Sequence, residues 1–250
     1  KSLPRDEEDS LSIKRILIKA SGQILAGDAG FGLDPEAVNA FADEVIAASE
    51  LAEVAIVVGG GNILRGSMAD DFQIDRVEAD NVGMLGTAIN ALILRGALTN
   101  KTTKDVRVMS ALPMTSVAEP YIRLRAMRHL DKGCIVIMAC GIGQPFVTTD
   151  YPSVQRAVEL DADVLLAAKN GVDGVYDRDP AIHADATRFD TISYDEVIQR
   201  DIRVMDPAAF ILARDHGMRI QVFDSAEAGA MKRIIGGENV GTRVGDSSKR

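Results

Sequence analysis

Short runs of apolar residues alternate along this chain with longer segments in which apolar residues recur at helical spacing. Four such runs, at residues 16–18, 55–58, 106–109 and 135–138, each end at glycines or at a polar turn. Continuous apolar runs of this length, bounded by turn residues, are typical of strands that are buried on both faces. The pattern therefore predicts four buried strands in the first part of the chain.

The segments between these runs predict helices. Asp34 and Pro35 provide an N-cap and a first helical residue for a helix that extends to about residue 51. Two further helices are expected at about residues 80–98 and 119–130. Strands that alternate with helices require right-handed crossovers and a mostly parallel sheet. The predicted fold class is α/β, a three-layer α/β/α sandwich with a mostly parallel central sheet.

The second half of the chain continues the same alternation. The expected strands are at residues 164–166, 220–223 and 241–244, with a turn at 171–176 and helices at 153–159, 207–216 and 226–235. Ser193 and Glu196 have the spacing of a capping box, which predicts one more short helix. No linker or repeat divides the chain, so we expect one continuous sheet. The predicted organisation is a flexible tail at residues 1–10 and a single domain over 11–250.

Composition and charge exclude several classes of protein. The chain has 250 residues, with 28 Lys and Arg against 37 Asp and Glu, a formal net charge of -9. That balance opposes binding to nucleic acid or to acidic membranes. Aromatic residues are 4% and Trp is absent, which disfavours a protein that stacks on exposed bases. No apolar stretch is expected to reach the length of a membrane span, and the first residues are polar, so we expect a cytoplasmic protein without nucleic-acid or membrane partners.

The cysteines and histidines do not suggest a metal site. Cys134 and Cys140 lie in and just after one apolar run, where two strand residues six apart cannot close a disulfide without a tight turn. The three histidines are scattered and do not pair with cysteine at ligand spacing. We expect buried free thiols and no protein-ligated metal.

Three glycine-rich loops follow predicted strands. They are KASG at residues 19–22, GGGNILRG at 59–66 and GIGQPFVTTD at 141–150. Such loops let backbone N–H groups approach an anion, although each loop alone is more often plain turn chemistry. Neither the dinucleotide fingerprint nor the P-loop pattern is present. Because ligands bind beyond the carboxyl ends of parallel strands, three loops together predict a ligand with several phosphates, or two phosphorylated ligands.

Two cations accompany these loops. Lys19 stands at the end of a buried strand, where a lysine is costly unless it meets an anion. Arg65 follows the triple glycine and has a guanidinium that can fork onto a phosphate. The alternative for both residues is a solvated surface charge.

The motifs together carry a resemblance to a known family. KASG, GGGNILRG, Asp80 with VGMLGT, GIGQPFVTTD, NGVDGVYDRDP and VMDPAAFILARD occur in this order between about residues 13 and 244. They resemble the bacterial-type uridylate (UMP) kinases of the amino acid kinase family. The resemblance implies ATP-dependent phosphorylation of UMP to UDP, with Mg²⁺ bound mainly through the nucleotide phosphates. It also implies a homohexamer built as a trimer of dimers, with GTP as activator and UTP as inhibitor.

The resemblance also implies roles for individual residues. Lys19 is expected to stabilise the transferring phosphoryl group, Asp150 to lie beside the reacting phosphates, and Asp206 to orient Lys19. The implied ATP contacts are Lys19, Ala20, Ser21, Gly22, Gly61, Arg65, Asn170, Tyr176 and Asp179. The implied UMP contacts are Gly60, Arg65, Asp80, Ile142, Gly143, Gln144, Pro145, Phe146, Val147, Thr148 and Thr149. The segment tied to GTP is Gly27, Asp28, Ala29, Gly30, Phe31 and Gly32, together with Arg95.

Several alternatives stay open from the residues themselves. Asp80 is equally a helix N-cap or a hydrogen-bond acceptor for a ribose. The Lys and Gly loops also suit a kinase for a small carboxylate, or a nucleotide-binding regulatory subunit without turnover. Lys169-Asn170-Gly171 matches one branch of the family and is one residue longer than another, so the residue that contacts adenine is not fixed.

Overall fold

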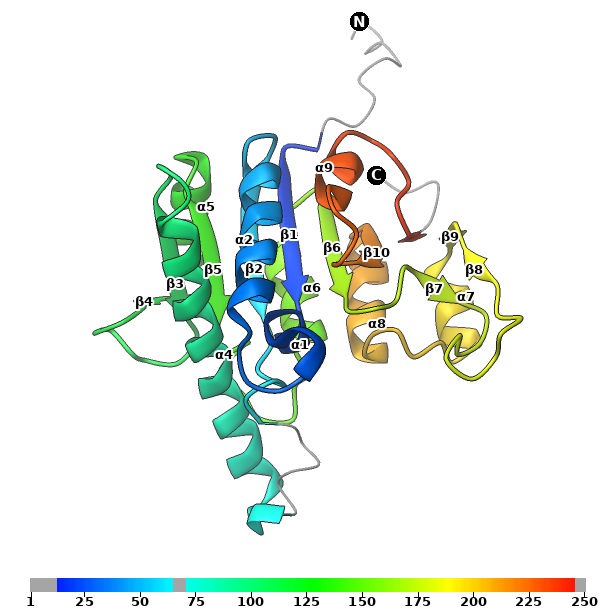
Figure 1. The fold of residues 1–250 in the computed structure, drawn as a ribbon, viewed down its shortest axis with the longest axis horizontal. Helices are drawn as coiled ribbons and strands as arrows, with labels where there is room; N and C mark the ends of the chain where they lie inside the picture. The colour runs from blue at the N-terminus through cyan, green and yellow to red at the C-terminus, as the bar shows by residue number, and fades with distance from the viewer. Residues whose placement is uncertain (1–12, 65–70, 246–250) are drawn as a thin grey trace, which may run out of the picture.

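The computed structural model describes residues 13–64 and 71–245, which form a sheet of nine strands between two layers of helices (Figure 1). The strand order is β4-β3-β5-β2-β1-β6-β10-β11-β9, and only the pair β10–β11 is antiparallel. The strands are β1 (Arg15–Ala20), β2 (Glu53–Val58), β3 (Val106–Ser110), β4 (Glu119–Pro120), β5 (Ile135–Ala139), β6 (Val164–Lys169), β9 (Thr191–Ile192), β10 (Ile220–Asp224) and β11 (Thr242–Val244). The predicted fold class, with one continuous and mostly parallel sheet, is confirmed.

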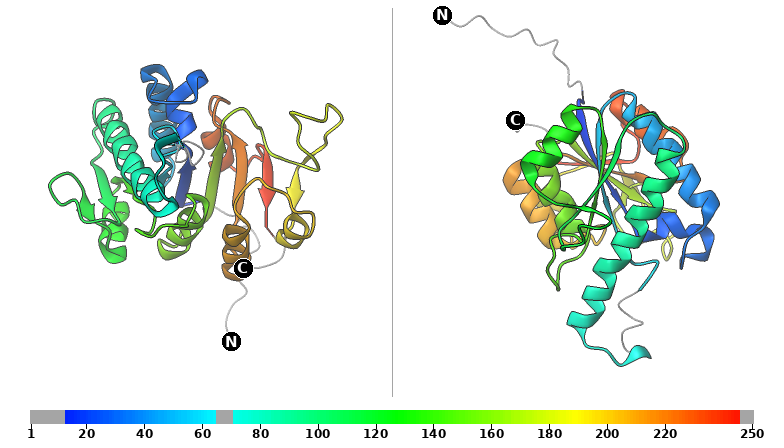
Figure 2. Two further views of the ribbon diagram at one scale, coloured as in Figure 1. Left: turned by 90° about the horizontal axis from the view of Figure 1, so that it is seen from below. Right: turned by 90° about the vertical axis from the view of Figure 1, so that its left-hand side faces the viewer.

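Helices cover both faces of this sheet (Figure 2). One layer contains α1 (Gly22–Ala26), α2 (Pro35–Ser49), α4 (Arg76–Thr99) and α9 (Ala230–Ile235), with the 3-10 turn η1 (Gly27–Ala29) after α1. The other contains α5 (Arg123–Asp131), α6 (Asp150–Glu159), α7 (Tyr194–Gln199) and α8 (Pro207–His216). A separate antiparallel ribbon is formed by β7 (Val175–Tyr176) and β8 (Arg188–Phe189).

The alternation of side chains along β1 determines where its lysine lies. Ile16 and Ile18 are fully buried in the core beneath α2 and α4. Leu17 is buried in the opposite core, beneath α5, α6 and α8. Because successive strand residues point to opposite faces, Lys19 lies on the same face as Leu17. The central strand therefore delivers this lysine to the α6 side of the sheet, close to its carboxyl edge.

Two predicted helix starts are wrong. Helix α4 begins at Arg76, and the Asp75 side chain is its N-cap, accepting the Glu78 N–H at 2.9 Å. Asp80 is therefore not the cap. The helix predicted over 119–130 begins only at Arg123, because Glu119–Pro120 pairs with β3 as the edge strand β4. An edge position suits a proline, which has no N–H to donate to a further strand.

Two further helix starts differ by three or four residues, and the remaining predicted helix starts agree. Helix α6 begins at Asp150, three residues earlier than expected, and α9 begins at Ala230, four residues later. The predicted turn at 171–176 ends in strand β7. Two predicted caps are confirmed, Asp34 for α2 and the Ser193–Glu196 capping box for α7, and Asp206 caps α8.

Helix α4 corrects one statement about membrane spans. With a mean hydropathy of 1.4 over its most apolar stretch, α4 is long and apolar enough to cross a membrane by length and composition alone. The expectation that no apolar stretch reaches this length is therefore wrong. Leu94 and Leu98 of this helix are fully buried in the core between α4 and the sheet. Its apolar character is accounted for in part by packing inside the fold.

A buried pair of asparagines fixes the triple-glycine loop to α4. Asn62 and Asn90 are fully buried and hydrogen-bond to each other in both directions, at 3.1 and 2.7 Å. The Asn90 amide also donates to the Gly59 carbonyl at 2.7 Å, and the Asn62 amide donates to the Gly32 carbonyl at 2.7 Å. The pair therefore joins two glycine loops to one helix.

Asn90→Ala is expected to lower the free energy of unfolding by about 3 kcal/mol, because it removes the side-chain donor to the buried Gly59 carbonyl and both hydrogen bonds to the Asn62 side chain. Asn39→Ala is the matched control, since Asn39 is an exposed helical asparagine that bonds the Pro35 carbonyl. The control should change stability by less than about 0.5 kcal/mol. Urea unfolding measures both, and equal losses would contradict the role of the pair.

Candidate functional site at the carboxyl edge of the sheet

A buried ion pair lies where β1 ends. The Lys19 side chain is 8% exposed, and its Nζ lies 2.9 Å from Oδ1 of Asp150, whose side chain is 17% exposed. Asp150 is the first residue of α6, so its carboxylate also lies at the positive end of that helix. The lysine predicted to meet an anion at a strand end does so.

Several groups stabilise the charged form of Asp150. Burial alone would raise the pKa of this carboxyl, but the charge and hydrogen bond of Lys19 lower it. The charge of Lys169 and the backbone N–H of Asp206, which donates to Asp150 Oδ2 at 3.0 Å, act in the same direction. The pKa of Asp150 is therefore below its ordinary value, and the carboxylate stays ionised at neutral pH.

Asp206 contacts Asp150 and, in the described residues, forms no ion pair with Lys19. One oxygen of its side chain accepts the Ala208 N–H at 2.9 Å as the cap of α8, and the other accepts the Thr148 hydroxyl at 3.1 Å. In the described part of the chain, the carboxylate that pairs with Lys19 is that of Asp150. The direct contact with Lys19 that was expected of Asp206 is thus made by Asp150.

A second lysine, Lys169, lies in the same cluster. The sequence patterns did not single it out as a cation of the site. Lys169 ends β6, next to β1, and its Nζ donates to the Val204 carbonyl. Burial lowers the pKa of Lys169, the charge of Lys19 lowers it further, and the charge of Asp150 opposes both, so that it comes to about 8. Its signal in the sequence is the one used for Lys19, a lysine directly after an apolar strand.

The glycine loops are packed too closely for side chains. A Cβ added to Gly22 would lie 2.1 Å from Oδ1 of Asn62, and one added to Gly60 would lie 2.3 Å from the carbonyl oxygen of Gly83. Gly59 approaches the backbone N of Gly22, which a Cβ would meet at 3.1 Å. At Gly22 and Gly60 glycine is therefore required for close approach rather than for an unusual φ, whereas Gly141 and Gly143 of the third loop have positive φ.

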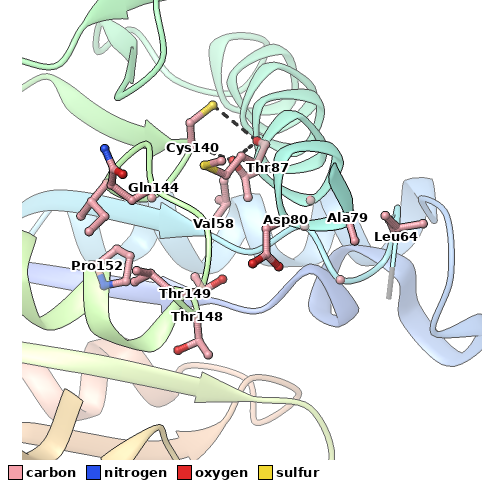
Figure 3. Close-up of a pocket in the computed structure, with 17 residues that line it drawn as sticks. Val58, Leu64, Ala79, Asp80, Thr87, Cys140, Gln144, Thr148, Thr149 and Pro152 are labelled. Carbon is pink, nitrogen blue, oxygen red and sulfur yellow. Dashed lines mark hydrogen bonds between the residues drawn. The ribbon is translucent and has the colours of Figure 1, made fainter. Parts of the chain in front are cut away.

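A cavity of about 160 Å³ opens beside these loops (Figure 3). Its walls are the triple-glycine loop, the first half of α4 and the segment at residues 140–149. Among the residues predicted to contact UMP, those that line it are Gly60, Asp80, Ile142, Gln144, Val147, Thr148 and Thr149. Gly143, Pro145 and Phe146 are not in its lining, and Arg65 lies outside the described residues.

Asp80 joins α4 to the segment that closes the cavity. Its carboxylate is contacted by Arg76 Nε at 2.9 and 3.0 Å and by the backbone N–H of Phe146 at 2.7 Å. The Phe146 ring itself is 65% exposed, with the Arg76 guanidinium 5.9 Å from its centroid. Asp80 is therefore an acceptor in the wall of the cavity and not the cap of α4, and its contact with a ribose stays a prediction.

Sequence reasoning missed two polar groups of the cavity. Cys140 has a φ of 63°, in the left-handed region, and its N–H donates to the Thr87 hydroxyl at 2.6 Å. Its thiol lies 3.4 Å from the Met84 carbonyl. Both cysteines are buried and free, as predicted. No pattern in the sequence indicates the conformation of Cys140, whereas Thr87 ends the VGMLGT motif that includes other cavity residues.

The residues implied for ATP lie on a different part of the same edge. Lys19, Ala20, Ser21 and Gly22 form the end of β1 and the start of α1, and Asn170 directly follows β6. Gly61 lines the cavity instead. Tyr176 donates its hydroxyl to Asp173 at 2.6 Å, and the Asp179 carboxylate accepts the Ala181 N–H at 2.9 Å, so both bond within the segment after β6.

The residues implied for GTP do not share one cavity. Gly27, Gly30 and Gly32 have positive φ values in the loop around η1. Arg95 donates to the Val117 carbonyl at 3.1 Å and lines a second cavity of about 370 Å³ beside β3 and β4. No residue of 27–32 lines that second cavity.

Comparison with known proteins identifies relatives over nearly the whole chain. Residues 14–224 match the model of the amino acid kinase family. The uridylate kinase of Frankia alni is 59% identical over 232 residues, which are 92% of this chain and 91% of the relative. The crystal structure of UMP kinase from Bacillus anthracis superposes with a TM-score of 0.93 at 52% identity, covering 95% of this chain and 98% of that one. UMP kinase from Ureaplasma parvum gives 0.88 at 33% identity, covering 94% and 100%.

The burial of Lys169 predicts a pH-dependent stability. With a pKa of about 8 against an ordinary 10.5, the folded chain releases this proton before the unfolded chain does. Stability should therefore rise between pH 8 and 10.5, by about 3 kcal/mol in total. Lys169→Met lacks the effect, so the variant should be more stable relative to the wild type at pH 7 than at pH 10. Urea unfolding measures the stability of both proteins at the two pH values. The same stability difference between them at pH 7 and at pH 10 would contradict the burial of a charge.

Proposed function

The chain belongs to the amino acid kinase family, and we propose that it transfers the terminal phosphoryl group of ATP to UMP, giving UDP. The support from other proteins is the 59% identity to a uridylate kinase and the TM-score of 0.93 against a UMP kinase. The observation in the structure that carries the proposal is that two consecutive residues belong to the cavity and to the buried ion pair. Thr149 lines the cavity, and the next residue, Asp150, holds Lys19.

This adjacency suits a reaction between two phosphates. UMP in the cavity directs its phosphate toward residues 148 and 149, beside the lysine at the end of β1. A UMP phosphate oxygen is already a nucleophile at neutral pH, so no strong base is required. Catalysis then consists of positioning and of neutralising negative charge. Lys19 supplies the charge, and Asp150, which stays ionised, fixes its position rather than accepting a proton.

The residues fit a Mg²⁺ ion that is bound mainly through the phosphates. In the described ranges, no three Asp, Glu, His or Cys side chains gather as a metal cluster. Asp150 is the carboxylate nearest to the reacting groups, and Lys19 occupies one of its oxygens. Mg²⁺ typically keeps few protein ligands and binds substrate phosphates, where it neutralises charge on the transferring group.

In this proposal each half of the chain binds mainly one of the two substrates. The first half, with Gly60, Asp80 and the segment ending at Thr149, forms mainly the UMP site. The second half, with Asn170, Tyr176 and Asp179 after β6, forms mainly the ATP site. Together they make one kinase domain over residues 11–250, preceded by a tail whose residues lie outside the described part.

Assembly and regulation follow from the family, with one supporting feature in the chain. Val82, Leu85, Ile89 and Ile93 are exposed and lie at intervals of three and four residues along α4. Such a stripe covers one face of a helix and supports a contact between subunits. We infer a cytoplasmic homohexamer, a trimer of dimers, activated by GTP and inhibited by UTP, with the effector segments Gly27 to Gly32 and Arg95 acting between subunits.

A substrate panel tests the activity. ADP release is measured with UMP, CMP, dUMP, aspartate and acetylglutamate, each with ATP and Mg²⁺. We expect turnover with UMP, since Asp80 and Thr149 of the cavity offer acceptors and donors for a ribose phosphate. Turnover with a carboxylate alone would replace the proposal by the small-carboxylate kinase. Binding of UMP without any turnover would favour a regulatory subunit.

Lys19→Ala is expected to lower kcat by a factor of about 10²–10³, because it removes the buried charge that faces the transferring group. Calorimetry should show UMP binding within about threefold of the wild type, since Lys19 is not in the lining of the cavity. Lys101→Ala, which breaks an ion pair with Asp43 far along the surface, is the control and should leave kcat unchanged. An undiminished rate in Lys19→Ala would remove this residue from the mechanism.

A further inference from the structure

The register of the sheet brings Lys169 to the carboxyl edge of the sheet, where Lys19 and Asp150 lie. Lys19 of β1 pairs with Ala167 of β6, so Lys169 stands two residues further toward the carboxyl end. Leu165 and Ala167 are buried in the same core as Leu17, which lies on the face that carries Lys19. Strand alternation therefore places both lysines on the α6 side of the sheet. In Figure 1 the arrowheads of β1 and β6 point to the same edge.

The two lysines of this cluster share a single ion pair. Lys19 and Lys169 share one near carboxylate, that of Asp150, which pairs with Lys19 at 2.9 Å. Over residues 13–64 and 71–245, Lys169 forms no ion pair, and the acceptor for its Nζ is the neutral Val204 carbonyl. A buried cation without its own counter-ion is costly unless an anion completes the site.

The remaining carboxylates around Lys169 are engaged by backbone N–H groups. Asp224 of β10 is its register partner, and it accepts the N–H groups of Gly171 at 3.2 Å and Ala226 at 3.0 Å. Asp206, at the start of α8, accepts the Ala208 N–H and the Thr148 hydroxyl. The charged groups that face Lys169 from neighbouring elements are thus Lys19, Asp150, Asp206 and Asp224. None of the three carboxylates forms an ion pair with Lys169 in the described part of the chain, so its ammonium group has no direct counter-ion.

We propose that Lys169 is a second catalytic cation, which leaves the Val204 carbonyl to contact a non-bridging oxygen of the phosphoryl group that ATP transfers. The inference rests on the proposed function. In the step it assists, an oxygen of the UMP phosphate forms a bond to the terminal phosphorus of ATP. The bond from that phosphorus to the bridging oxygen breaks, and ADP leaves with the electron pair. Lys169 keeps its proton throughout, and the step needs no oxidant or reductant.

A structural role for Lys169, as a donor to Val204 alone, makes different predictions. A structural donor affects stability and leaves the pH dependence of turnover to other groups. A catalytic cation must be protonated during turnover. Since the pKa of Lys169 in the free protein is about 8, kcat/KM for ATP should fall as the pH rises above 8.

The test compares the full-length wild type with Lys169→Met, which keeps the length of the side chain without its charge, and with Lys169→Arg. We expect Lys169→Met to lower kcat with UMP and ATP by a factor of about 10², with KM for UMP within about threefold. Lys169→Arg should keep at least about a tenth of the rate and lose the decline above pH 8, because an arginine stays protonated.

Lys104→Met is the matched control. Lys104 also donates to a backbone carbonyl, that of Ser49, and it lies away from the reacting edge beside Glu50. Its replacement should leave kcat and the pH profile unchanged. If the Lys169→Met protein does not fold, the pH profiles of the wild type and of Lys169→Arg decide the question.

The outcomes separate the two proposals. Wild-type protein that does not turn over UMP contradicts the proposed function and, with it, the role of Lys169. Wild-type turnover that Lys169→Met reduces by less than about threefold contradicts the role of Lys169 alone. An alkaline decline that persists unchanged in Lys169→Arg also overturns the inference.

Discussion

The arrangement of the site depends on the burial of the Lys19–Asp150 ion pair. Two charges with side-chain exposures of 8% and 17% are stable there only if they meet each other and further polar groups. The central strand β1 brings the lysine, the start of α6 brings the carboxylate, and the loop before α8 adds the Asp206 N–H. Three elements distant in the sequence are thereby held at one point of the sheet edge.

The wall of the cavity at the triple-glycine loop is formed by the backbone, whereas the ion pair beside the cavity is formed by side chains. On the cavity side, close packing of Gly59 and Gly60 lets main-chain groups form the wall, and Asp80 fixes α4 to the backbone at Phe146. On the other side, charged side chains provide the field. Because Thr148 bonds Asp206 while Thr149 precedes Asp150, the same short segment connects both parts. Binding of an acceptor is therefore coupled by covalent geometry to the position of the lysine.

Much of the sheet and of the reacting edge could be predicted from the sequence. Apolar runs predict the buried strands. Lys19 could be predicted as a site residue because a cation at the end of such a strand requires an anion. Helix starts were less predictable, since Asp75 and Asp80 are both good caps and only the tertiary position of the loop selects one. The edge strand at Pro120 depends on pairing with β3, a contact between distant residues. Cys140 and Thr87 meet only through the crossing of α4 over β5, which no local pattern encodes.

The close approach of Gly60 to α4 has a mechanical consequence. The Gly60 Cα faces the carbonyl oxygen of Gly83 so closely that even a methyl group would collide, at a distance of 2.3 Å. Where main chain meets main chain, no rotamer can absorb a displacement. At this point the loop has no space to slide along α4, so the position of the helix fixes this wall of the cavity.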